Sequence, residues 1–155
     1  MGFRISALDV NKFSHLFGLD DEALLQCGVR RTVADSKPGY PCRVSLQDAE
    51  VGETVLLMNY EHQAAPTPYR SSHAIFVREW AETAVLESDQ VPIMLRSRLL
   101  SVRVFDDSGM MVEADVIEGE KLESLIERML GIDSTKYLHI HNAKLGCYAA
   151  RVDRD

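Results

Sequence analysis

The 155-residue sequence lacks any long apolar run. Its apolar stretches, such as residues 55–58, fall far short of the roughly 20 residues that a membrane-spanning helix needs. The N-terminus also lacks the apolar segment of a secretory signal peptide. Only three cysteines occur, and no two of them form a CxxC pair. An odd number of cysteines without a secretion signal is typical of reduced thiols, so we expect a cytoplasmic protein.

The sequence has fewer basic residues than acidic residues. The chain has 17 Lys and Arg residues against 24 Asp and Glu residues, and its net charge is −7. A surface this acidic repels phosphate groups, so we expect neither a nucleic-acid partner nor docking on anionic membranes. The apolar fraction of 46% and the charged fraction of 26% are ordinary for a globular protein. We therefore expect a single globular domain over residues 1–155.

Strand-like patterns dominate the chain. Residues 53–60 and 73–79 are apolar on both faces in their middle, as in central strands, and residues 100–104 and 110–116 alternate between apolar and other positions. Residues 122–130 instead carry apolar side chains at the i, i+3, i+4, i+7 spacing of an amphipathic helix, and Gly131 can end that helix. In all we expect about seven strands and about three helices. This pattern predicts an α+β fold with a mainly antiparallel sheet.

The segment 100–116 is typical of a β-hairpin. A three-residue loop over Asp107 to Gly109 would place Gly109 in the left-handed conformation that such loops need. In that register Val104 lies opposite Val112, and Arg103 forms a cross-strand pair with Glu113.

Two buried strands are joined by a long polar loop, expected over residues 61–72. Such loops often carry function. Arg70, Ser71, Ser72 and His73 cluster at its end, and together they could hold a carboxylate or a phosphate. The structural alternative is that Arg70 pairs with Glu61 and the hydroxyls satisfy the loop backbone.

His139 and His141 are separated by one residue, which on a strand places both imidazoles on one face with Cα atoms about 7 Å apart. A metal site would need a third ligand, such as His62, His73 or Glu61. The alternative is a polar sheet face on which the histidines orient other groups. We therefore assign no metal ligands from the sequence.

Cys42 follows a turn-rich segment and precedes Arg43. A cysteine beside an arginine could be a nucleophile, but a free cysteine is more often a small buried apolar residue. Arg43 as an anion ligand is therefore favoured over Cys42 as a nucleophile.

Three segments of the chain, residues 39–43, 71–79 and 139–142, resemble a bacterial family known as domain of unknown function 1203. The resemblance extends over essentially the whole chain. It implies a single-domain, bacterial, cytoplasmic protein. Since the family has no established activity, the resemblance implies no reaction and no catalytic residue.

The residues themselves favour a polar pocket for a small anionic ligand, formed where the loop at 61–73 meets Cys42 and Arg43. His73 or His139 would be the acid or base, because histidine titrates near neutral pH. The other candidate ligand-binding residues are Cys42, Arg43, His62, Arg70, Ser71, Ser72 and His141.

Two alternatives remain open. One is a non-catalytic interaction or homodimerisation module, and the other is a metal-dependent enzyme that uses the two histidines at 139 and 141. No P-loop, GxGxxG, HExxH or GxSxG motif occurs, so the sequence identifies no cofactor.

Overall fold

The computed structural model describes residues 2–155 and confirms the α+β class. These residues form eight strands, one more than the expected number, and the strands belong to two antiparallel sheets instead of one. Three α-helices and three short 3-10 helices complete the described part. No helix among these residues is both long enough and apolar enough to cross a membrane.

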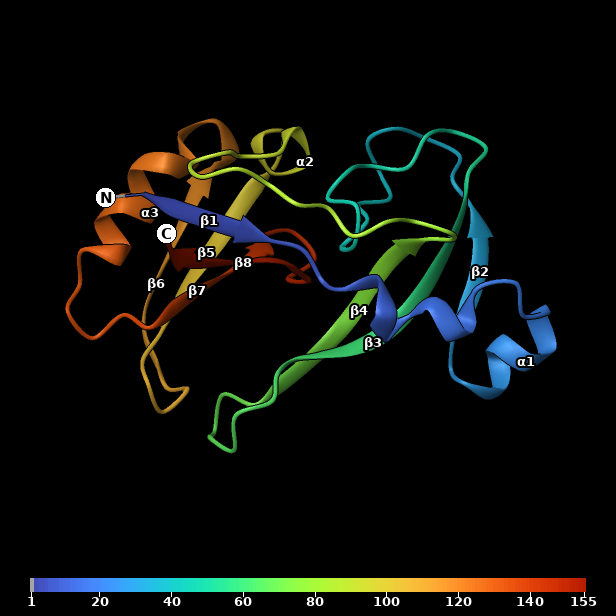
Figure 1. Cartoon of the computed structure of the whole chain (residues 1–155), viewed down its shortest axis with the longest axis horizontal. Coiled ribbons are helices and arrows are strands. Elements are labelled where there is room, and N and C mark those ends of the chain that lie inside the picture. Colours follow the sequence, from blue (N-terminus) through green and yellow to red (C-terminus); the bar gives the residue numbers. More distant parts are fainter. Residues whose placement is uncertain (1) are drawn as a thin grey trace.

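The larger sheet has five strands in the order β1, β8, β7, β5, β6. These are β1 (Phe3–Ser6), β8 (Tyr148–Arg154), β7 (Tyr137–Asn142), β5 (Leu99–Phe105) and β6 (Met111–Glu118). The first strand pairs with the last, with Phe3 opposite Arg154, so the two ends of the chain lie together beside this sheet (Figure 1).

The smaller sheet has three strands in the order β2, β3, β4, and it forms the other side of the molecule with helix α1 (Asp21–Gln26) (Figure 1). Its strands are β2 (Arg30–Val33), β3 (Thr54–Gln63) and β4 (Ser71–Arg78). Strand β3 continues past the expected end at Tyr60, because its pairing with β4 resumes after an irregularity between Tyr60 and Gln63. The predicted loop over 61–72 is therefore shorter than expected, and His62 belongs to a strand.

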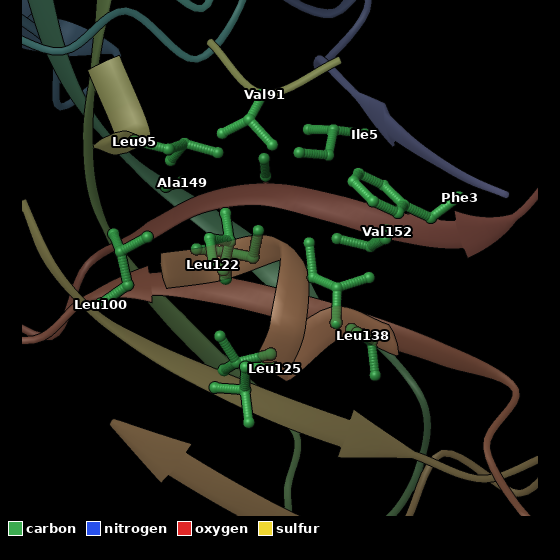
Figure 2. Packing of buried hydrophobic residues seen from close by; sticks show 14 of the residues in the cluster. Phe3, Ile5, Val91, Leu95, Leu100, Leu122, Leu125, Leu138, Ala149 and Val152 are labelled. Carbon is green, nitrogen blue, oxygen red and sulfur yellow. The ribbon is translucent and has the colours of Figure 1, made fainter. Parts of the chain in front are cut away.

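Helix α3 (Leu122–Leu130) is found where its apolar spacing predicts it. Its buried face, which includes Leu122 and Leu125, packs against one face of the larger sheet, where Leu100, Leu138 and Val152 contribute to the same core (Figure 2). The short helix α2 (Ile93–Arg96) adds Met94 and Leu95 to that core. This apolar packing leaves the opposite face of β7 turned toward the smaller sheet.

The hairpin formed by β5 and β6 differs in register from the prediction. Val104, not Arg103, lies opposite Glu113, and the expected pairing of Val104 with Val112 is wrong. The register shifts beyond Val104, where Phe105 pairs with Met111, so Val112 is an extra residue in β6. Such a bulge inserts one residue into one strand only. Gly109 has the predicted positive φ of 81°.

Candidate metal centre

Three histidines converge between the two sheets. His139 and His141 lie on β7, and the residues that alternate with them, Leu138 and Ile140, are buried in the core against α3. The imidazoles therefore point to the other face of the sheet, as the spacing of two predicts. His62, near the end of β3, meets them there. One nitrogen from each ring can be chosen so that all three nitrogens lie within 4.8 Å of one another.

One nitrogen on each ring of this cluster lacks a hydrogen-bond partner among the described residues. His139 and His141 are buried, and His62 is half-buried. His62 Nδ1, His139 Nδ1 and His141 Nε2 are shielded from solvent without a partner in the described residues. His141 Nδ1 lies 2.9 Å from the carbonyl oxygen of Gly146. If Nδ1–H donates to that carbonyl, the lone pair of His141 lies on the unpartnered Nε2, the arrangement found in many metal-ligating histidines.

Burial keeps the three imidazoles neutral. Desolvation, followed by the positive charge of Arg103, lowers the pKa of His62 to about 4. Desolvation and the charges of the other two histidines lower the pKa of His139 to about 3. Desolvation likewise lowers the pKa of His141 to about 3, although its hydrogen bond to Gly146 opposes the shift. Neutral imidazole is the form that binds a metal ion.

Aromatic rings enclose the cluster. The ring of Tyr148 is stacked on that of His62, and the rings of Phe105 and Tyr137 lie 4.9 and 5.1 Å from that of His139. Gln63, next to His62, donates a hydrogen bond of 2.7 Å from Nε2 to the Tyr137 hydroxyl and so links β3 to β7. An apolar shell of this kind restricts the access of water and fixes the orientation of the rings.

A guanidinium group lies beside the histidines. Arg103 on β5 is directly opposite His139 on β7, and its positive charge lowers the pKa of all three histidines. Arg103 is half-buried, its own pKa is lowered by desolvation, and within residues 2–155 it pairs with no carboxylate. The neighbouring Arg151, by contrast, is bound to Asp153 at 2.8 Å. Arg103 therefore offers a positive charge that no carboxylate of the described chain balances.

The other predicted site residues of the 61–73 segment lie outside this cluster. His73 is half-buried on β4 opposite Tyr60, and its Nδ1 lies 3.3 Å from the Ala74 carbonyl oxygen. Arg70 is exposed and pairs with Glu61 at 3.0 Å, as in the structural alternative. Ser71 donates its hydroxyl to the Tyr69 carbonyl, and Ser72 is exposed on the same strand.

Cys42 and Arg43 are both buried. The Cys42 sulfur accepts the backbone N–H groups of Ser45 and Arg78. Arg43 donates to the Tyr148 carbonyl at 2.7 Å and to the sulfur of Cys147 at 2.9 Å. Arg43 and His73 line the same cavity of about 620 Å³, whereas Arg70 does not line it.

Two groups of residues were not found by sequence reasoning. Arg103 was expected in a pair with Glu113, but it lies opposite Ala114 on β6 and opposite His139 on β7. The other group is Cys147 and Tyr148, to which the sequence assigns no role. No local pattern distinguishes them, because their partners lie far away in the sequence. The ring contact of Tyr148 with His62, for example, joins β8 to β3.

Comparison with known proteins gives one match. A family model described as "Protein of unknown function (DUF1203)" covers residues 39–154, which include the three histidines and Arg103. No curated protein matches the chain. No solved structure matches it either.

Proposed function

We propose that this chain, which belongs to the DUF1203 family, binds a divalent transition-metal ion through His62, His139 and His141 and acts there on a small anionic ligand. One observation carries the proposal. Three neutral imidazoles converge from two sheets with ring nitrogens within 4.8 Å of one another, and a buried nitrogen on each ring has no hydrogen-bond partner among the described residues.

A metal ion would remove the cost of these unpartnered nitrogens. Leaving a buried polar atom without a partner costs about 1–3 kcal/mol. Imidazole nitrogen is a preferred ligand of zinc, iron, copper and nickel, and zinc–nitrogen bonds are about 2.0–2.1 Å long. Nitrogens around a tetrahedral zinc ion are therefore about 3.4 Å apart. The chosen nitrogens of the three histidines lie within 4.8 Å of one another, a spacing of the same order.

Three protein ligands leave a coordination position open, which is typical of catalytic metal sites and not of structural ones. Arg103 supports an anion at that position, because its guanidinium lies beside His139 and has no carboxylate partner in the described residues. We therefore propose that the expected anionic ligand binds next to Arg103 and the histidines, instead of next to Arg70. When no anion occupies it, the open position would hold a water whose pKa the metal lowers toward neutrality.

The metal content of the full-length chain tests this function. After incubation with zinc and dialysis, mass spectrometry should find close to one zinc per chain. His62→Gln, His139→Gln and His141→Gln should each weaken zinc binding at least tenfold, whereas His15→Gln, at an exposed histidine outside the cluster, should not. A cobalt-loaded sample should show the visible absorption of a tetrahedral site. Zinc binding that is absent, or unchanged in the His62 variant, would overturn the proposal.

An interaction or homodimerisation module remains the alternative function. It predicts a chain that binds no metal and associates with itself, which sedimentation of the same samples would detect. We also propose that the protein is cytoplasmic. Cys27, Cys42 and Cys147 support this location because all three are free thiols, as expected in a reducing compartment.

A further inference from the structure

A second polar cluster lies at the cavity of about 620 Å³, apart from the histidine centre. The cavity lies between the turn at residues 38–43, strand β4 and the turn that joins β7 to β8. Apolar side chains such as Leu57, Phe76 and Leu145 form much of its wall, and none of the three clustered histidines lines it. Arg43, Asn142 and Cys147 lie together at this wall.

The sulfur of Cys147 accepts hydrogen bonds from two side chains. Arg43 Nη2 donates to it at 2.9 Å, and Asn142 Nδ2 donates at 3.4 Å. Cys147 is only 5% exposed, but it lines the cavity and is reachable from it. Cys42, by contrast, is fully buried and does not line the cavity.

Arg43 is a buried cation without an acidic partner in residues 2–155. Its side chain is 1% exposed, and its other donors are bound to the carbonyl oxygens of Pro41 and Tyr148. A guanidinium stays charged in proteins, and a buried charge needs an opposite charge nearby. Of the groups bound to Arg43, only the sulfur of Cys147 can carry a negative charge. Arg43 therefore places its positive charge against the sulfur of Cys147, and a positive charge beside a cysteine sulfur favours attack by that sulfur.

Asn142 supplies independent evidence for a ligand. This side chain is 9% exposed, and it lines the cavity. Its Nδ2 donates to Cys147, but its Oδ1 is buried without a hydrogen-bond partner in the described residues. A buried acceptor without a donor is costly, so the site lacks a group that can donate to it.

The charged residues that line the cavity indicate the charge of its ligand. Arg43, Arg98 and Lys144 line the cavity and no Asp or Glu does, in a protein whose net charge is −7. Arg98 is neutralised by Asp48, so Arg43 and the exposed Lys144 remain as the source of attraction. The cavity therefore suits a small molecule with an apolar body and an anionic group.

We propose that this cavity is a reactive site in which Cys147 attacks a small electrophile that has an apolar body and an anionic group. The Cys147 thiol loses its proton to solvent, and its sulfur forms a bond to the electrophilic carbon while the bond from that carbon to its leaving group breaks. The leaving group departs with the electron pair of the broken bond, and no further reactant is needed. Asn142 Oδ1 accepts a hydrogen bond from the bound molecule.

Alkylation of the folded, full-length chain tests this site. Iodoacetate and iodoacetamide differ in charge but form the same sulfur–carbon bond, with iodide as the leaving group. Peptide mass spectrometry can follow all three cysteines in one sample, with the exposed Cys27 as the reference. We expect the ratio of the iodoacetate rate to the iodoacetamide rate to be at least fivefold higher at Cys147 than at Cys27. Cys42 should react only after unfolding in urea.

Reversing the charge of Lys144, which lines the cavity, tests whether the cavity attracts the anionic reagent or Cys147 is merely accessible to any reagent. Lys144→Glu should slow the reaction of Cys147 with iodoacetate at least threefold and leave its reaction with iodoacetamide nearly unchanged. Lys121→Glu, at an exposed lysine that does not line the cavity, makes the same charge change and should alter neither rate. Two outcomes would overturn the proposal. One is a Cys147 that reacts only in urea, and the other is a rate ratio equal to that of Cys27.

Discussion

The ring of His62 is stacked on that of Tyr148, with centroids 5.5 Å apart and planes 6° from parallel. The two residues belong to different sheets, since His62 lies on β3 and Tyr148 begins β8. Tyr148 also presents its ring to His139 at 5.1 Å and to His141 at 5.8 Å. One buried tyrosine thus contacts every histidine of the proposed metal centre and holds the sheets in the arrangement that brings them together.

This contact makes Tyr148 a positioning residue. Tyr148→Ala should weaken zinc binding about tenfold or more, because changes to the shell around metal ligands typically cost 10- to 100-fold in affinity. Tyr148→Phe retains the stacked ring and should bind zinc within about twofold of the natural chain. Titration against a coloured chelator measures both affinities. Equal zinc affinity in the Ala and Phe variants would show that the stack does not position His62.

Arg103 should have opposite effects on the metal and on the anion. Its positive charge repels a bound cation, so Arg103→Gln should bind zinc as tightly as the natural chain or several-fold more tightly. The same variant should bind inorganic phosphate about tenfold more weakly in the cobalt-loaded protein, because a charge-assisted hydrogen bond is lost. The visible spectrum of cobalt reports the phosphate. Arg151→Gln is the matched control, since Arg151 is already paired with Asp153. Identical phosphate affinity in all three proteins would count against the anion site.

Without metal, the histidine cluster should make the protein sensitive to acid. The pKa values of His62, His139 and His141 are about 4, 3 and 3 in the folded chain, against an ordinary value of 6.5. Between pH 6.5 and these values the unfolded chain binds more protons, so the free energy of unfolding should fall as the pH falls through this window. Well above pH 6.5 the three imidazoles are neutral in both the folded and the unfolded chain, so they cause no further change of stability with pH.

Urea denaturation at several pH values measures this effect. The variant His139→Leu removes one of the three groups and should reduce the slope of stability against pH by about one third in the acid window. A variant of the exposed His15 should leave the slope unchanged. A metal-free natural chain whose urea midpoint is constant from pH 7 to pH 5 would contradict the assignment of neutral, buried imidazoles.

Arg98 and Asp48 form the most enclosed ion pair of the described chain, with side chains 17% and 7% exposed. Arg98 Nη1 donates to Asp48 Oδ2 at 3.0 Å and also to the Met94 carbonyl, so the pair joins the 41–48 segment to the end of α2. Asp48→Asn leaves a cation without its partner and should lower the free energy of unfolding by about 3 kcal/mol. Glu61→Gln breaks an exposed pair with Arg70 and should cost less than about 1 kcal/mol. Similar urea midpoints for the two variants would refute this difference.

Local patterns predicted the elements that depend on neighbours in the sequence. The i, i+3, i+4 spacing placed helix α3 at residues 122–130, and the alternation of His139 and His141 with apolar residues placed both imidazoles on one face of β7. In each case the periodicity of the backbone determines the side-chain direction, so the sequence alone suffices.

The features that sequence reasoning missed depend on contacts between distant segments. The strands belong to two sheets, and no periodicity reports which strands pair. His62 was expected in a loop, because the polar residues 61–63 lack apolar alternation, but pairing with β4 extends the strand through them. The extra residue Val112 shifts the partner of Arg103 on β6, and such a bulge has no clear signature in the sequence. The place of Arg103 beside His139 depends on the pairing of β5 with β7.

The pairing of β1 with β8 determines when the chain can finish folding during synthesis. The three-stranded sheet needs only residues 30–78, whereas the five-stranded sheet joins Phe3 to Arg154 across nearly the whole chain. Contacts between such distant residues form slowly, because the intervening chain must first be ordered. His62 therefore emerges from the ribosome with the three-stranded sheet, before His139 and His141 of the five-stranded sheet have been synthesised. A metal ion that needs all three histidines can bind only after the last strands have left the ribosome.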